Sequence, residues 1–415
     1  MESRRSLFSA FGVELEYMVV DAESLDILPA ADTVLCSADG IVTGEVERGA
    51  VDWSNELVAH VIELKVSQPV PTLVGLESQL QAEVREINRR LAQHNARLMP
   101  TAMHPWMDPL EETVLWPHEY NAVYSAFDRI FSCQGHGWSN LQSVHLNLPF
   151  ASDEEFGRLH AAIRLVLPLL PALTASSPMV EGRLTGLMDN RLEYYRTNSR
   201  AVPLVAGRVI PEAVFTPADY RDQILERLYA AIAEHDPDQI LRHEWLNARG
   251  AIARFERGAI EIRVMDVQEC PAADVAICAA VVAVLRELVE ERHVSWNAQQ
   301  AVEVEPLASV FLESLRNAER TLVWNDDYLK VFGVDREECT LQDLWRILLD
   351  RAAAAGRIDS AHLETLEVIV NEGPLSRRIA RGLFEKTEPS ADAVEELYGF
   401  LCQCLDEGTL FQVEV

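Results

Sequence analysis

The stretch "FGVELEYMVV", residues 11–20, combines the composition of a buried β-strand with two acidic side chains. Val13, Leu15 and Tyr17 alternate with Glu14 and Glu16, and alternate residues of a strand point to opposite faces of its sheet. One face of this strand is therefore apolar, and the other carries two carboxylates side by side. Because like charges repel each other, the stretch predicts a sheet whose polar face binds something positive.

The same pattern recurs in three further segments, each with a pair of polar side chains two residues apart. These pairs are Glu63 and Lys65 in "VIELKVS" (61–67), His145 and Asn147 in "SVHLNLPF" (143–150), and Glu261 and Arg263 in "AIEIRVMD" (259–266). A half-solvated antiparallel sheet is the ordinary explanation of such alternation. The residue types favour a binding face, because Glu and Asn are poor strand formers. Glu56, at the mouth of the segment 57–67, adds one more carboxylate.

A cluster of carboxylates with one histidine is typical of a divalent cation site. Magnesium takes oxygen ligands from carboxylates and shares them with substrate phosphates. Arg263 beside Glu261 would then neutralise charge on a phosphoryl group during its transfer. The sequence contains no GxxxxGK[ST] motif, which excludes a P-loop ATPase.

Charge and composition restrict the partners of the protein. The 415 residues carry a formal net charge of −30, which argues against nucleic acid and against an anionic membrane surface as partners. The seven cysteines are scattered and form no CxxC pair, as in a reduced cytoplasmic protein. The N-terminal residues lack the apolar core of a signal peptide, and the run "AICAAVVAVL" (276–285) is too short to span a bilayer. We therefore expect a cytoplasmic protein with no membrane partner.

The order of the predicted elements favours an α+β fold. Apolar residues at spacings of three and four predict a long amphipathic helix within 71–99. The stretches 104–140 and 176–219 look irregular, and a loop as long as the second is usually functional or disordered. We predict an antiparallel sheet covered by helices on its apolar face, with strands at 11–21, 57–67, 143–150 and 253–271, helices at 153–178, 219–235 and 272–293, and mostly helices from 296 to 415.

Four motifs occur in a fixed order: "GVELEYMVVD" (12–21), "ELVAHVIELKVSQP" (56–69), "SVHLNLPF" (143–150) and "ARGAIARFERGAIEIRVMDVQECP" (248–271). Together they resemble the glutamate–cysteine ligase family, in its bacterial carboxylate–amine ligase branch of the glutamine-synthetase-like superfamily. The resemblance covers about residues 8–295 and continues into the helical portion 296–415. It implies one catalytic domain over residues 1–415, built on an antiparallel sheet that curls into a funnel-like active site and is covered by helices.

The resemblance also implies a reaction and its residues. ATP, with Mg2+, would phosphorylate a substrate carboxylate, and an amine would attack the acyl phosphate to give an amide. The positions that match the metal ligands of the family are Glu14, Glu16, Glu56, Glu63, His145 and Glu261, and Arg263 matches an arginine that contacts the transferring phosphate. Glu261 and Arg263 are thus the expected catalytic pair. Glutamate and cysteine are the leading substrates. Another amino acid or amine, and a non-catalytic regulator that binds ATP or an amino acid, are the alternatives, and a homo-oligomer is compatible with all of them.

Three arginines outside the four motifs are candidates for binding substrates. Arg183 and Arg191 lie where the resemblance places substrate recognition, and arginine forms bidentate pairs with carboxylates. Surface ion pairs are the alternative explanation in so acidic a protein. Arg377, in "LSRRIARGL" (375–383), is a candidate contact to the phosphates of ATP, and an amphipathic helix with a basic face is the alternative.

Overall fold

A computed structural model describes residues 4–37, 39–384 and 386–413. In this part of the chain, eight strands form one antiparallel sheet in the order β2-β3-β4-β1-β6-β10-β9, and β5 pairs with the second half of β1. The strands are β1 (Gly12–Asp21), β2 (Glu45–Val46), β3 (Val51–Asn55), β4 (Val61–Val66), β5 (Ala96–Met99), β6 (Ser143–Pro149), β9 (Ala251–Arg254) and β10 (Ala259–Asp266). The four strands with polar pairs, β4, β1, β6 and β10, are direct neighbours.

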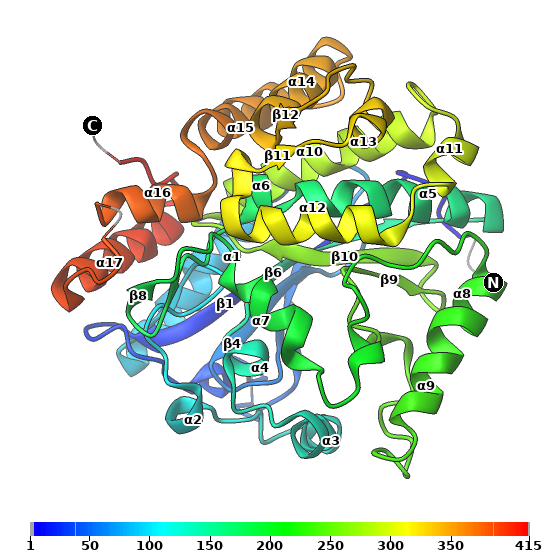
Figure 1. Cartoon of the computed structure of the whole chain (residues 1–415). Helices are drawn as coiled ribbons and strands as arrows, with labels where there is room; N and C mark the ends of the chain where they lie inside the picture. Colours follow the sequence, from blue (N-terminus) through cyan, green and yellow to red (C-terminus); the bar gives the residue numbers. More distant parts are fainter. Residues whose placement is uncertain (1–3, 38, 385, 414–415) are drawn as a thin grey trace.

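Helices cover the apolar face of this sheet. Val13, Leu15 and Tyr17 of β1 are fully buried in a core that includes side chains of α1 (Leu76–Leu91) and α10 (Pro271–Val289). The apolar stripe of α1 faces this core, whereas α10, apolar on nearly all sides, is buried along almost its whole length. Figure 1 shows α5 (Asp153–Val166), α10 and α12 (Val304–Asn317) on one side of the sheet. The predicted α+β class with an antiparallel sheet is therefore confirmed.

The sheet is open. The path of paired strands ends at β2 and at β9, and no pairing joins these two strands among the described residues. A funnel made by a closed sheet is therefore not seen, and a curled funnel and a single catalytic domain over 1–415 stay predictions.

The C-terminal residues contribute mainly helices, drawn from yellow to red in Figure 1. These are α12, α13 (Asp326–Val331), α14 (Leu341–Ala354), α15 (Ser360–Glu372), α16 (Leu375–Gly382) and α17 (Ala391–Glu407), with a small hairpin of β11 (Leu322–Val323) and β12 (Cys339–Thr340). The last helix returns to the N-terminal half of the fold, because α17 packs against α1 and β5. The seven cysteines form no disulfide, and no described helix has the length and apolar character needed to cross a membrane.

Three segments differ from the expectation. The stretch 104–140 contains α2 (Pro109–Glu112), α3 (Asn121–Phe131) and α4 (His136–Ser139), and the stretch 176–219 contains the hairpin of β7 (Met179–Val180) and β8 (Arg183–Leu184), then α7 (Asn190–Asn198). Helix α7 lacks an apolar stripe, because Asn190 and Arg191 are among the side chains that it buries. The segment 253–271 holds no single strand, since a turn at Gly258 separates β9 from β10.

Candidate active site

The register of the sheet brings the predicted polar residues together on one face. Glu14 of β1 lies opposite His145 of β6, and Glu16 of β1 lies opposite Glu63 of β4. Glu261 of β10 lies opposite Asn147 of β6, one strand further along. Direct partners in an antiparallel pair have their Cβ atoms about 5 Å apart. Residues from four neighbouring strands therefore converge on one site.

Hydrogen bonds hold the first part of this cluster. Nδ1 of His145 lies 3.1 Å from a carboxylate oxygen of Glu14, and Asn147 donates to the other oxygen at 3.0 Å. The backbone N–H and the hydroxyl of Ser143 both donate to Glu16, at 2.7 and 2.9 Å. These side chains therefore have defined orientations toward one another.

The second part of the cluster lies at the end of β3 and in β4. Ser54 donates to Glu63 at 2.6 Å, and the ammonium of Lys65 lies 3.7 Å from the same carboxylate. Glu56 follows β3 directly. Two sets of three residues could each hold a metal ion: Glu16, Glu56 and Glu63 form one set, and Glu14, Glu63 and His145 form the other. Within each set, one possible ligand atom from every residue lies within 4.8 Å of the other two. Two sets of three donors therefore share Glu63.

The surroundings stabilise the charged form of some side chains in the cluster and destabilise the charged form of others. Burial raises the pKa of Glu14, but the hydrogen bond from His145, together with the charges of His145 and Arg257, leaves this pKa below its ordinary value. Burial and the charge of Glu14 raise the pKa of Glu63 to about 7, and burial and the charge of Glu16 raise the pKa of Glu56 well above its ordinary value. Although burial opposes the charged form of His145, the hydrogen bond with Glu14 and the charges of the surrounding glutamates raise its pKa to about 9. The cluster therefore favours additional positive charge near Glu56 and Glu63.

Glu261 has a different environment, because two arginines bind it. Arg254 donates to one carboxylate oxygen at 2.8 Å and Arg263 donates to the other at 2.5 Å. Burial raises the pKa of Glu261, but the charges of Arg263, His145 and Arg254 together hold this pKa well below its ordinary value. Glu261 is therefore ionised, and it fixes the orientation of both guanidinium groups.

A cavity of about 500 Å³ lies over the polar face. Its opposite side carries five aromatic residues, which we call the aromatic wall: Tyr120, Tyr124, Phe127, Trp138 and Trp245. Ring centroids of Phe127 lie 5.3 Å from those of Trp138 and 5.8 Å from those of Trp245. The cavity thus joins a carboxylate side to an apolar side. Helices α3, α4 and α7 lie on this side of the sheet in Figure 1.

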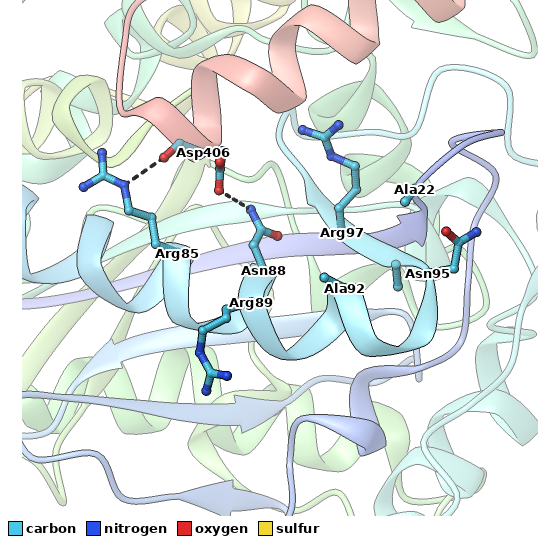
Figure 2. A pocket seen from close by; sticks show the side chains of 9 residues that line it. Ala22, Arg85, Asn88, Arg89, Ala92, Asn95, Arg97 and Asp406 are labelled. Carbon is cyan, nitrogen blue, oxygen red and sulfur yellow. Dashed lines mark hydrogen bonds between the residues drawn. The ribbon is translucent and has the colours of Figure 1, made fainter.

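A second hollow, of about 710 Å³, lies between α1, β5 and the end of α17. Figure 2 shows Arg85 and Asn88 directed at Asp406 across it. Arg85 donates to the carbonyl oxygen of Asp406 at 2.9 Å, and Asn88 donates to its carboxylate at 3.0 Å. These contacts join α1 to the C-terminal helix, and none of the predicted site residues lines this hollow.

The predicted site residues fall into two groups. The cavity is lined by Glu14, Glu16, Glu56, Glu63, His145, Arg191, Glu261 and Arg263. Arg191 is 2% exposed and donates to Asp266 at 2.5 Å, so this arginine is already paired. Arg183 and Arg377 do not line the cavity.

These two arginines lie outside the cavity. Arg183 is on the exposed hairpin of β7 and β8, 3.6 Å from Glu388. Arg377 donates to Glu319 at 2.8 Å, in the C-terminal helical part. Both arginines thus have acidic partners distant in the sequence. Their contacts to a substrate and to the phosphates of ATP stay predictions.

The sequence reasoning missed several lining residues. Arg254 ends β9 and Arg257 lies in the turn between β9 and β10, before the strand that carries Glu261. Gly258, with φ of +66°, was the available signal, since glycine commonly marks such a turn. The aromatic wall gave no periodic signal, because its residues come from the loop before α3, from α3 and α4, and from the 3-10 helix at Glu244–Leu246.

Comparisons with known proteins agree with this geometry. The sequence model of the glutamate–cysteine ligase family 2 matches residues 10–399. A protein of Archaeoglobus fulgidus, whose name gives no activity, is 32% identical over 400 residues, which cover 96% of this chain and 99% of that protein. The protein named "Putative glutamate--cysteine ligase 2-3" of Rubrobacter xylanophilus is 26% identical over 292 residues, which cover 68% of this chain and 70% of that protein.

Two solved structures share the fold. The glutamate–cysteine ligase of Francisella tularensis in complex with AMP superposes with a TM-score of 0.57 at 10% identity, over 98% of this chain and 90% of that chain. A bifunctional glutathione synthetase from Pasteurella multocida superposes with a TM-score of 0.56 at 13% identity, over 97% of this chain and 52% of that chain. At such identities the likeness is one of fold.

Proposed function

The chain belongs to the glutamate–cysteine ligase family 2, and from this premise we propose that it is an ATP- and Mg2+-dependent ligase that joins a carboxylate to an amine. The observation that carries the proposal is the convergence of five glutamates and His145 on one cavity. The leading reaction joins glutamate and cysteine through an acyl phosphate, and the names of several relatives support this choice of substrates.

The donor set fits magnesium. Glu14, Glu63 and His145 would hold one ion, and Glu16, Glu56 and Glu63 would hold a second, because each set has its ligand atoms within 4.8 Å of one another. Glu261, which lines the same cavity and is bound by Arg263, would be a further carboxylate ligand. When bound, such ions offset the negative charge of ATP and of the phosphoryl group in transfer. Carboxylates with raised pKa values lose their protons more easily beside a cation.

The side chains of this protein have separate tasks in the proposed reaction. Glu261 holds Arg263 in a fixed orientation, so that its guanidinium can donate to the phosphoryl oxygens as their charge changes. The aromatic wall offers a flat apolar surface for the adenine ring. By excluding water from one side of the cavity, it also protects an acyl phosphate from hydrolysis.

The pairing of Arg191 favours a second candidate function. Arg191 is bound to Asp266, and Arg183 does not line the cavity, so these two arginines give no specific support to glutamate as the substrate. A ligase of the same chemistry that joins a different amino acid or amine is therefore the alternative. A regulator that binds ATP without turnover is the alternative from another class.

The test is ATP turnover with defined amino acid pairs. We expect ADP and phosphate to be released only when both a carboxylate and an amine substrate are present, with the amide product identified by its mass. Oxygen-18 placed in the substrate carboxylate should appear in the released phosphate. AMP and pyrophosphate among the products would contradict the acyl phosphate route. Mg–ATP binding without turnover on any pair would favour the regulator.

A further inference from the structure

The cations that line the cavity differ in whether a carboxylate already binds them. Lys65 pairs with Glu45 at 3.1 Å, Arg191 with Asp266 at 2.5 Å, Arg254 with Glu261 at 2.8 Å and Arg263 with Glu261 at 2.5 Å. Arg257 also lines the cavity, and it forms no ion pair with any other residue that the structure describes. Its guanidinium is therefore available to a ligand.

The backbone holds Arg257 at the rim of the cavity. Arg257 lies in the turn between β9 and β10, where its N–H donates to the carbonyl of Arg254 at 3.0 Å. Gly258 completes the turn with a φ of +66°. The side chain of Arg257 is exposed. Its charge is also felt inside: against burial, which raises the pKa of Glu14, the hydrogen bond from His145 and the charge of Arg257 lower it.

The charge of the site favours a cation at this position. ATP and a carboxylate substrate such as glutamate are anions, yet they enter a cavity with five glutamates in a protein of net charge −30. A guanidinium presents donors in a planar fork that matches two oxygens of a carboxylate or a phosphate. Because Arg257 has no carboxylate partner among the residues that the structure describes, it can bind an incoming oxyanion without breaking an ion pair seen there.

Resting on the proposed function, we propose that Arg257 binds an oxyanion of the substrates at the cavity rim. This oxyanion is either the carboxylate of an amino acid substrate or the phosphates of ATP. Arg257 would thus be a specificity-determining residue that the four sequence motifs do not identify.

The experiment compares Arg257→Gln and Arg257→Lys with the wild-type enzyme. The control is Arg316→Gln, because Arg316 is an exposed arginine of α12 that does not line the cavity. The KM of each substrate is measured for the amino acid pair that the wild type turns over. We expect Arg257→Gln to raise the KM of one anionic substrate about 10- to 100-fold, the usual effect of losing a charged hydrogen bond, with kcat nearly unchanged. Lysine should restore part of the loss, and the melting temperature should not move.

The arms of the experiment separate the two sources of the oxyanion. A raised KM for ATP alone assigns Arg257 to the phosphates. A raised KM for one amino acid assigns it to a carboxylate, provided that an analogue without this carboxylate binds the wild type and Arg257→Gln equally. If the wild type is active and Arg257→Gln leaves every KM unchanged, this inference is overturned and the proposed function is not. A wild type with no turnover on any pair overturns the proposed function, and this inference with it.

Discussion

The two faces of β1 place one strand in two opposite environments. Val13, Leu15 and Tyr17 are fully buried in the apolar core, whereas Glu14 and Glu16 face the cavity. Both sets of residues share the same backbone pairing with β4 and β6. The difference between the faces therefore comes from the side chains, and it separates what stabilises the fold from what supports the chemistry.

The apolar face favours folding, whereas two carboxylates of the polar face, Glu56 and Glu63, oppose it when they are ionised. Burying a Val or Leu side chain stabilises a fold by about 1.5–3 kcal/mol. On the polar face, the pKa of Glu63 is raised to about 7 by burial and by the charge of Glu14. At about 1.4 kcal/mol for each unit of pKa shift, ionised Glu63 opposes folding by an amount on the order of 3 kcal/mol. The apolar face therefore compensates a cost that the polar face imposes.

The largest effect is expected on the polar face, from Glu14→Gln. We expect ATP-dependent turnover to fall by about 10³-fold, because an amide in place of this carboxylate weakens the proposed cation site. The fold should survive, since the amide can keep contacts to His145 and Asn147. ADP release measures the activity. Glu23→Gln, an exposed change just beyond β1, is the control and should remain active.

Full activity in a folded Glu14→Gln variant, together with the wild-type melting shift on addition of Mg–ATP, would remove the basis of the metal site.

A change on the apolar face should give the second-largest effect, which lowers stability and leaves activity unchanged. Leu15→Ala removes a fully buried side chain from the core and should lower the free energy of unfolding by about 2–5 kcal/mol. The folded fraction should keep the kcat of the wild type. Denaturant unfolding and active-site-normalised kinetics check both statements. Leu312→Ala, at a site that is 38% exposed, is the control. A large loss of kcat in folded Leu15→Ala would show that the two faces are not separable.

A third change asks whether Arg263 acts in catalysis or only as a counter-charge. Lysine keeps the charge but loses the planar fork, so Arg263→Lys should lower kcat by about 10²-fold. The KM for ATP should change less, which is the signature of an interaction made mainly in the transition state. Steady-state kinetics measures both constants. A nearly normal kcat would mean that Arg263 serves only to balance Glu261 in the sheet.

The residues of β1, β4, β6 and β10 were predictable because both faces of these strands leave a trace in the sequence. Apolar residues alternate with the polar pairs, so the strands and the faces of their side chains follow from a period of two. Helix α7 escaped prediction because its inward side is polar, with Asn190 and Arg191 buried.

Ion pairs escaped prediction for a different reason. Arg191 pairs with Asp266, 75 residues away, and Arg377 pairs with Glu319, 58 residues away. No local pattern relates such partners, so the sequence could suggest that these arginines bind substrates but could not show that they were already paired. The aromatic wall likewise forms only when separate segments pack together.

The smallest effect should be a gain in stability on the polar face. The charges of Glu16, Glu63 and Glu14 surround Glu56, and burial and these charges raise its pKa well above its ordinary value. Glu56→Gln removes this repulsion and should raise the melting temperature in Mg2+-free buffer, by an amount worth about 1 kcal/mol. The control is Glu367→Gln, an exposed change on α15.

The dependence of this gain on pH follows from the direction of the shifts. The pKa values of Glu56 and Glu63 are raised in the folded protein. At pH values between the ordinary pKa and the raised pKa, the folded state therefore binds more protons than the unfolded state. Stability is therefore lost as the pH rises through this window. The difference in melting temperature between Glu56→Gln and the wild type should be small near about pH 5 and larger near about pH 8.

Added Mg2+ should reduce the difference by stabilising the wild type more than the variant. A variant that melts below the wild type at all these pH values would mean that Glu56 makes a stabilising contact, and that the polar face does not oppose folding.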